Sequence, residues 1–539
     1  MTSPALGAAP RAGIPAFVII GFSLLLLTGR LLGGNFTAFF GLDDISLASG
    51  VAALVRDSIS YVYRYGPQVG YYQLVRALDV LAGNDIRTIP IIMIWLSIVA
   101  GTVIPVCGFF LYRDELSRVE RLLIAGLLAV NPILWMSSAY GNSAMPSVAL
   151  LAVGVTIFSN KPGVIAEGVG LTLFGAAILV RADAVLAFPA VAVMLHQRHG
   201  SLRAVVTRVG PLVVAMGALY GTLWLVDPHM RGAVDDVTGH LTGPFLTRFW
   251  DYLVWSTSPI ILAFAVVGFR QLLAERGKLS LFVATWCLPF FAFYFASTTQ
   301  PRYFLPTVVP VAMCAAVGMV SLVPLLAGRR PWVAWVSLVV LATLHLFVGL
   351  SHFTPASPRS LVEQSQFETQ VGPLWTGAFL YKSYMVPSFL GRSLRQPGFG
   401  RGHRLGESLD SSLAEVASGA ARDRTIIVVP AGWAGHLFHF YAHVYAAQYI
   451  SRKPGRFFDS ESSLSLGGAR LVWWNVRSGD SRATELPALA DGDQVWMISP
   501  TPTDENVLRG RLPLGVTLKA YGDTAAAQFR TYRVERTGS

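Results

Sequence analysis

The sequence has little charge for its length. Only 14% of its 539 residues are Asp, Glu, Lys or Arg, whereas 53% are hydrophobic. A soluble domain carries about 25% charged residues, so this chain holds more apolar material than a water-soluble core needs. The composition predicts a multi-pass α-helical membrane protein.

Cysteines are also few, and none lies in a polar segment. Cys107, Cys287 and Cys314 all fall inside apolar runs. Disulfide frameworks need cysteines in the exported polar segments themselves, so we expect no disulfide framework. A metal site built from cysteines is unsupported for the same reason.

The excess of positive charge has a topological explanation. The net charge is +11 and the pI about 9.7, but membrane proteins collect Arg and Lys on their cytoplasmic loops. We therefore expect no nucleic-acid partner. The wealth of Ala, Gly, Val and Arg and the scarcity of Lys are typical of a GC-rich bacterial genome, which favours a bacterial cytoplasmic (inner) membrane.

About eleven apolar runs approach the length of about 20 residues that a helix needs to cross the hydrocarbon core. They lie near 14–33, 89–111, 121–139, 143–159, 163–180, 184–196, 208–226, 252–269, 280–297, 303–327 and 332–350. No small-residue cleavage site follows the first run, so we expect it to be retained.

The loops between these runs predict the orientation. With a cytoplasmic N-terminus, the inner connections are YRDELSRVER, SNKPG, HQRHGSLRAVVTR, RQLLAERGK and GRRP, and each contains Lys or Arg. An odd number of crossings leaves the C-terminus outside. We therefore predict a membrane domain over 1–350 and a soluble periplasmic α/β domain over 351–539.

Strand and helix patterns support the α/β assignment of that second domain. TIIVVP at 425–430, LVWWNV at 471–476 and VWMIS at 495–499 are typical of buried strands, and 434–450 of a helix. His436, His439 and His443 share one face of this helix. The face is either packed or a zinc site, and we favour packing because the glutamate of HExxH is missing.

The first outer loop, 35–88, is too long for a simple connection. Apolar residues at helical spacing over 47–62 and 74–81 predict two amphipathic helices on the membrane surface, joined by RYGPQVGYYQL. Asp43 and Asp44 stand at the front of this loop. Adjacent carboxylates at a membrane boundary are either solvated helix-end residues or a general base, with or without a divalent ion.

Three further outer segments carry polar residues. Arg181 and Asp183 form either a salt-bridged turn or part of a site. Arg302 and Tyr303 precede an apolar run, where a guanidinium either anchors the helix or reaches a phosphate. Asn142 lies between two runs and either caps a helix or lines a pocket.

These elements, in this order, resemble the GT-C class of membrane glycosyltransferases, in particular the protein O-mannosyltransferases and lipid A aminoarabinose transferases. The resemblance covers 1–350 and not the C-terminal domain. It rests on Asp43 and Asp44, the turn with Tyr65, Gly66, Pro67, Tyr71 and Tyr72, the NP-to-GNS hairpin, the turn from Arg181 to Asp183 followed by Pro189, and PRYFLP.

The resemblance implies transfer of a sugar from a polyprenyl-phosphate donor to a cell-envelope glycan, lipid or protein on the outer face, with membrane lipids as surroundings. It implies inversion at the sugar, with Asp43 or Asp44 as the base and Arg302 and Tyr303 at the donor phosphate. Residues expected to line the pocket or order its loops are Arg64, Tyr65, Tyr71, Tyr72, Asn142, Arg181 and Asp183.

Two questions stay open at this point. A divalent ion, magnesium or manganese, is compatible with the acidic pair. The resemblance implies, for some members of the class, a second acidic residue in a later outer loop, and the candidates here are Asp227, Asp235, Asp236 and Asp251. The alternative function is a membrane transporter or a lipid-linked saccharide flippase. Transporters place polar residues at the bilayer midplane and often show repeats, and no repeat is visible here.

Overall fold

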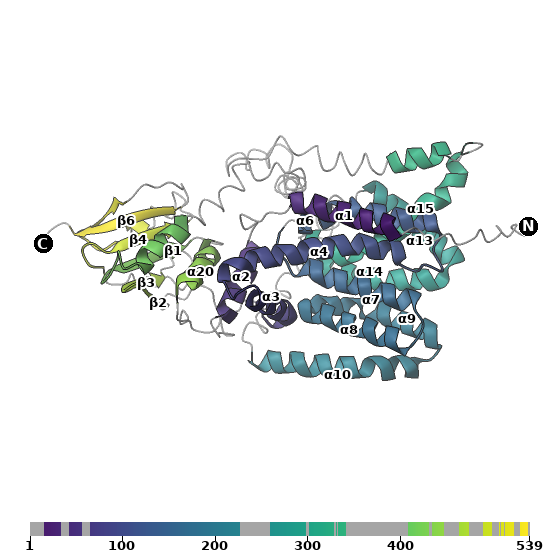
Figure 1. Ribbon diagram of the computed structural model, residues 1–539, viewed down its shortest axis with the longest axis horizontal. Helices are drawn as coiled ribbons and strands as arrows, with labels where there is room; N and C mark the ends of the chain where they lie inside the picture. The colour runs from purple at the N-terminus through teal and green to yellow at the C-terminus, as the bar shows by residue number, and fades with distance from the viewer. Residues whose placement is uncertain are drawn as a thin grey trace, which may run out of the picture.

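The computed structural model consists of a helical bundle with a mixed β-sheet at one end (Figure 1). We call the two ends of the bundle the sheet end and the far end. The structure describes residues 16–33, 42–55, 65–138, 140–226, 259–297, 301–327, 330, 332–340, 408–430, 434–446, 463–473, 489–498, 506, 508–510, 512–521 and 529–536.

The bundle contains most of the predicted apolar runs as helices. They are α1 (Ala16–Gly33), α4 (Ile89–Phe110), α5 (Arg118–Ala129), α6 (Pro132–Ser138), α7 (Ala144–Asn160), α8 (Val164–Val180), α9 (Phe188–His199), α10 (Leu202–Val226), α13 (Pro259–Glu275), α14 (Gly277–Ser297) and α15 (Val308–Ala327). Within the described ranges, the helices long and apolar enough to cross a membrane are Ile86–Phe110, Leu202–Val226, Gly277–Phe295 and Tyr303–Pro324.

The run at 121–139, which we predicted to be one helix, is two. Helix α5 ends at Ala129 and α6 begins at Pro132. The Oδ1 atom of Asn131 accepts hydrogen bonds from the backbone N–H groups of Ile133 (3.0 Å) and Leu134 (3.2 Å). An Asn cap followed by Pro at the first helical position is a strong helix start, so the chain turns here.

Two other runs begin with tight 3₁₀ turns at the sheet end. Turn η4 (Ala182–Ala187) precedes α9, and turn η6 (Pro301–Thr307) precedes α15. Each turn contacts α14, so the two segments lie beside the same helix. The polar residues of the RAD and PRYFLP motifs are therefore held by short rigid turns rather than by long loops.

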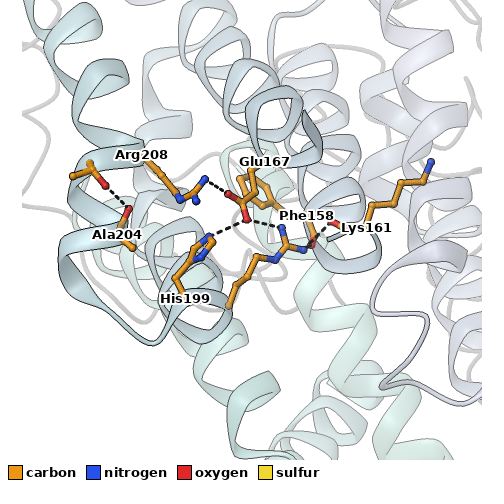
Figure 2. A network of polar contacts seen from close by, with 8 residues as sticks. Phe158, Lys161, Glu167, His199, Ala204 and Arg208 are labelled. Atoms are coloured by element: carbon orange, nitrogen blue, oxygen red, sulfur yellow. Dashed lines mark hydrogen bonds and ion pairs between the residues drawn. The ribbon is translucent and has the colours of Figure 1, made fainter. Parts of the chain in front are cut away.

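The far end of the bundle is held by a buried carboxylate that bonds two arginines and a histidine (Figure 2). Glu167, in the first turn of α8, is only 3% exposed. Its carboxylate accepts hydrogen bonds from Arg198 (3.1 Å) and His199 (2.9 Å) at the end of α9, and from Arg208 (2.5 Å) of α10. Arg198 also donates to two carbonyls at the C-terminal end of α7. Glu167 thus joins α8, α9 and α10, and Arg198 extends the network to α7.

The C-terminal domain contains a six-stranded sheet in the order β2-β3-β1-β4-β6-β5. The strands are β1 (Thr425–Pro430), β2 (Ser463–Leu466), β3 (Ala469–Trp473), β4 (Gln494–Ile498), β5 (Val516–Ala520) and β6 (Phe529–Arg536). Strand β1 pairs in parallel with β3 and β4, and the outer pairings are antiparallel. All three predicted strands are confirmed, and helix α20 (Ala434–Tyr445) follows β1 as predicted.

We expect Glu167→Gln to destabilise the bundle, because two arginines and a histidine would lose their common anion. Breaking a buried ion pair from one side costs about 3 kcal/mol of unfolding free energy. The measurement is the thermal unfolding midpoint of purified protein in detergent. Glu275→Gln is the control, because the Glu275 side chain on α13 is exposed, and an unchanged midpoint for Glu167→Gln would contradict the expectation.

Candidate active site

The acidic pair lies in the first turn of a short helix. Helix α2 runs over Leu42–Val55, so Asp43 and Asp44 are its second and third residues. Carboxylates are favoured there because the unpaired N–H groups of a helix start carry partial positive charge. The side chains of Asp43 and Asp44 lie outside the described part of the structure.

Helix α2 is enclosed by protein on two sides. Ile45 belongs to the same apolar cluster as Leu437 of α20, in the sheet domain. Val51 belongs to a second cluster with Met93 of α4 and Phe440 of α20. The helix therefore lies between the bundle and α20 (Figure 1), and its apolar side chains contact protein.

Polar contacts reinforce this junction. The Nη2 atom of Arg87, in turn η3 (Ile86–Thr88), donates to Asp410 (3.2 Å) and to the hydroxyl of Tyr445 (2.9 Å). The Tyr445 hydroxyl donates in turn to Asp410 (2.7 Å).

The aromatic turn of the first outer loop packs against the bundle. Turn η2 (Gly66–Gln68) and helix α3 (Val69–Leu81) place Tyr65, Tyr71 and Tyr72 in the interior, each at most 5% exposed. A side chain at Gly70 would come within 2.7 Å of Leu179, so glycine is needed where α3 crosses α8. The leucines of α3 at 74, 78 and 81 lie on its more exposed side, and Arg64 lies outside the described residues.

The RAD and PRYFLP motifs, far apart in the sequence, meet at the sheet end. The Nε atom of Arg181 donates to Asp183 Oδ2 (2.6 Å), and Asp183 also accepts a hydrogen bond from the hydroxyl of Tyr294. The Arg181 guanidinium lies 5.0 Å from the ring centre of Tyr303, whose ring is 5.3 Å from that of Tyr294. This cluster is the polar centre of the candidate site.

Its electrostatics favour a fixed ion pair. Burial acts to lower the pKa of Arg181, and Asp183 outweighs that effect, so the pKa lies above its ordinary value. Arg181 thus stays charged at every physiological pH. Arg302 is the residue before Tyr303 in η6, which places its backbone at this cluster, whereas its side chain lies outside the described set.

Asn142 is committed to the backbone around it. Its Nδ2 atom donates to the carbonyls of Ser137 (2.5 Å) and Tyr140 (3.1 Å), and its Oδ1 accepts from the N–H of Met145 (2.9 Å). Both the donor and the acceptor of the Asn142 side-chain amide therefore bond the turn between α6 and α7. This pattern fits the loop-ordering alternative better than direct contact with a substrate.

The histidines of α20 lie inside the domain. His439 and His443 are 4% and 3% exposed, and His443 Nδ1 lies 2.6 Å from the carbonyl of His439. The side chain of His436 falls outside the description. No group of three or more His, Cys, Asp and Glu side chains in the described ranges is arranged to hold a metal ion.

Sequence reasoning missed three features of the structure. Tyr294 lies in an apolar run and gave no signal. The contact of Arg87 with Asp410 joins segments more than 300 positions apart, which a single sequence cannot pair. The third feature is the buried side chain of Arg30 in α1. The sequence did contain a signal for it, because a charged residue inside an apolar run is rare.

Comparisons with known proteins place the fold. No family profile matches the chain, and no curated protein matches it in sequence. Among solved structures, ArnT from Cupriavidus metallidurans in the apo state aligns with a TM-score of 0.57 at 12% identity, over 96% of this chain and 98% of that one. The same ArnT bound to undecaprenyl phosphate aligns with a TM-score of 0.56 at 12% identity, with the same coverage.

A third structure, the oligosaccharyltransferase of Archaeoglobus fulgidus, aligns with a TM-score of 0.47 at 12% identity over 79% of this chain and 63% of that one. The alignment with ArnT covers nearly the whole of both chains, including the C-terminal domain. The chain therefore has the GT-C membrane fold, and the fold predicted from its motifs is confirmed.

We expect Tyr294→Phe to loosen the cluster of Arg181, Asp183 and Tyr303. The variant removes one hydrogen bond to a largely buried carboxylate, and bonds to charged groups contribute about 1.5–3 kcal/mol. The thermal midpoint in detergent measures the loss. Tyr521→Phe serves as the control, since the Tyr521 side chain is 46% exposed; equal midpoints for both variants would show that the hydroxyl of Tyr294 contributes nothing.

A double-mutant cycle tests the junction between the first outer loop and the sheet domain. Arg87→Ala and Asp410→Ala, alone and together, should give a coupling energy of about 0.5–1 kcal/mol, because both partners are partly exposed. The coupling should shrink as salt is raised. A coupling near zero at low salt would mean that apolar packing alone holds the two parts together.

Proposed function

We propose that this protein is a glycosyltransferase of the bacterial inner membrane. It transfers a sugar from a polyprenyl-phosphate donor to an acceptor of the cell envelope on the periplasmic side. The observation that carries the proposal is the position of α2. The helix that bears Asp43 and Asp44 is held at the same end of the bundle as the RAD turn and the PRYFLP turn.

The fold supports this proposal. The chain matches ArnT over nearly its whole length, and that protein has been solved with undecaprenyl phosphate bound. A polyprenyl phosphate offers an apolar tail for the bilayer and an anionic head for arginines. Arg181 and Arg302 supply cationic groups at the sheet end.

In the proposed reaction, Asp43 or Asp44 accepts the proton of the acceptor hydroxyl. The freed oxygen attacks the anomeric carbon of the sugar, and the bond from that carbon to the phosphate oxygen breaks. The electron pair of that bond stays on the lipid phosphate, whose charge Arg302 and Tyr303 stabilise. One attack opposite the leaving group inverts the anomeric carbon.

The remaining residues hold the pocket in shape. Arg181 and Asp183 fix the turn against Tyr303, and Tyr65, Tyr71 and Tyr72 bury the loop that follows α2. Arg64 and Asn142 complete this set, at the pocket or in its loops. Two adjacent carboxylates are also oxygen ligands that magnesium or manganese accepts, and such an ion would stabilise the leaving phosphate.

The distribution of buried carboxylates favours an enzyme over a transporter. Of the described helices, those that bury an acidic side chain carry it near one end: Glu120 begins α5, Glu167 begins α8, and Asp79 lies near the end of α3. Transporters place such groups near the midplane of the bilayer. A flippase is therefore the weaker alternative.

Single variants of the acidic pair test the proposal. In proteoliposomes supplied with radiolabelled polyprenyl-phosphate sugars, Asp43→Asn or Asp44→Asn should slow transfer about 10²–10⁴-fold, as expected for loss of a general base. The donor KM should change little. Asp114→Asn, an exposed aspartate at the far end, is the control, and full rates in both α2 variants would rule out the base.

A further inference from the structure

A buried arginine in α1 has no acidic partner. Arg30 lies three residues before the end of the helix and is 1% exposed. Its Nη1 atom donates to the carbonyl of Leu134 (3.0 Å) and to the hydroxyl of Ser138 (2.5 Å). Its Nε and Nη2 atoms have no hydrogen-bond partner among the residues that the structure describes.

The surroundings are shaped to hold this guanidinium. The ring of Trp135 lies 4.7 Å from it, and the indole of Trp135 is itself anchored by a hydrogen bond to the Ala129 carbonyl. Gly101 of α4 faces the same spot, where a side chain would come within 2.9 Å of Arg30 Nη1. The absence of a side chain at Gly101 thus leaves space for the Arg30 guanidinium between α1, α4 and α6.

Arg30 lies beside the middle of α4. Gly101 is the thirteenth residue of α4, about 18 Å along the helix from its start at the sheet end. A charge at such a depth is costly unless an anion or a full set of hydrogen bonds compensates it. The two hydrogen bonds of Nη1 meet only part of that need.

The geometry of the unused donors identifies the missing partner. The Nε–H and one N–H of Nη2 lie parallel on one edge of a guanidinium, the edge that binds two oxygens of one oxyanion. The protein occupies the other nitrogen, Nη1, and leaves this buried edge without a hydrogen-bond partner among the described residues. An anion with two accessible oxygens fits it.

The place of α1 indicates where that anion comes from. Half of the other side chains of α1 whose burial the structure describes are exposed on the bundle surface, including Phe17 (73%) and Leu25 (71%), so this face of the helix borders lipid. Arg30 points instead toward α6, which contacts the PRYFLP turn. A lipid that lies along α1 can bring its head group to Arg30 without crossing the bundle.

We propose that the Nε and Nη2 edge of Arg30 binds the phosphate of a lipid. We take the lipid to be a polyprenyl phosphate whose tail lies along α1, and this choice rests on the proposed function. A phospholipid head group offers the same phosphate chemistry and is the second source. The site is separate from Arg302, which belongs to η6.

Binding to the full-length protein in phosphatidylcholine nanodiscs tests this inference. With polyprenyl monophosphate as the probe, Arg30→Gln should raise the Kd at least about tenfold, because a charge-assisted bidentate contact is lost. Arg30→Lys, which keeps the charge without the paired donors, should give an intermediate Kd. Arg113→Gln is the matched control, since it makes the same change at an exposed arginine of the far end, and its Kd should stay within about twofold of wild type.

Competition separates the two sources of phosphate. Displacement of the probe by added phosphatidylglycerol in wild type, but not in Arg30→Gln, would assign the site to bilayer phospholipid. Resistance to phosphatidylglycerol would assign it to the polyprenyl lipid. Equal Kd values for wild type and Arg30→Gln would overturn the inference and leave Arg30 as a clamp between α1 and α6.

A structure of the wild-type protein with the probe bound keeps the test valid if the variants do not fold. A phosphate within about 4 Å of Nε and Nη2 supports the inference, because paired N–H donors act at that range, and a phosphate elsewhere with this edge still bare overturns it. Failure of the proposed function would differ, because wild type would then bind lipid phosphate at Arg30 and transfer no sugar.

Discussion

The packing of α2 between the bundle and α20 is the contact on which the arrangement of the sheet end depends. Ile45 faces the core of the sheet domain, and Val51 faces the first outer loop and α4. A helix of 14 residues is marginal by itself in water, so burial on two sides is what fixes its direction. Because Asp43 and Asp44 belong to α2, this packing also fixes the position of their backbone. The sheet domain therefore helps to position the candidate site.

The charges inside the molecule follow a simple division. At the far end, the Glu167 carboxylate accepts hydrogen bonds from Arg198 and His199 of α9 and from Arg208 of α10. At the sheet end, Arg181 pairs with one carboxylate and lies against an aromatic ring. Beside the middle of α4, Arg30 bonds a backbone carbonyl and a hydroxyl and lies against the Trp135 ring, and it has no carboxylate partner among the described residues.

The sequence allowed the fold to be predicted well wherever periodicity was long. The apolar runs, the strands of 425–430, 471–476 and 495–499, and the order of the outer motifs all carried local signals. The Asn131–Pro132 break was visible as a cap and a proline, but the apolar run masked it. Strand β6 was missed because polar residues occupy most of its positions, Arg530, Arg533 and Arg536 among them, and such a segment resembles a charged surface loop.

The site was predicted less completely, for physical reasons. Arg181 and Asp183 are neighbours in sequence, so their ion pair could be anticipated, but the contact of Arg181 with Tyr303 joins distant segments. The roles of Asp43, Asp44 and Arg302 remain proposals, since their side chains lie outside the described residues. Arg30 could have been identified from the sequence as a candidate binding residue, because ionisable residues within membrane-spanning helices are rare and usually functional.

The exposure of α10 has a consequence for handling the protein. This helix buries only Val205 and Val209 among its described side chains, and both lie in its first half. Arg208 ties that half to Glu167, while most side chains of the other half are exposed, and Tyr220 bonds the Ile178 carbonyl of α8. In a membrane, acyl chains would surround these exposed side chains, so we expect a short-chain surfactant to perturb the second half of α10 before the interior of the bundle.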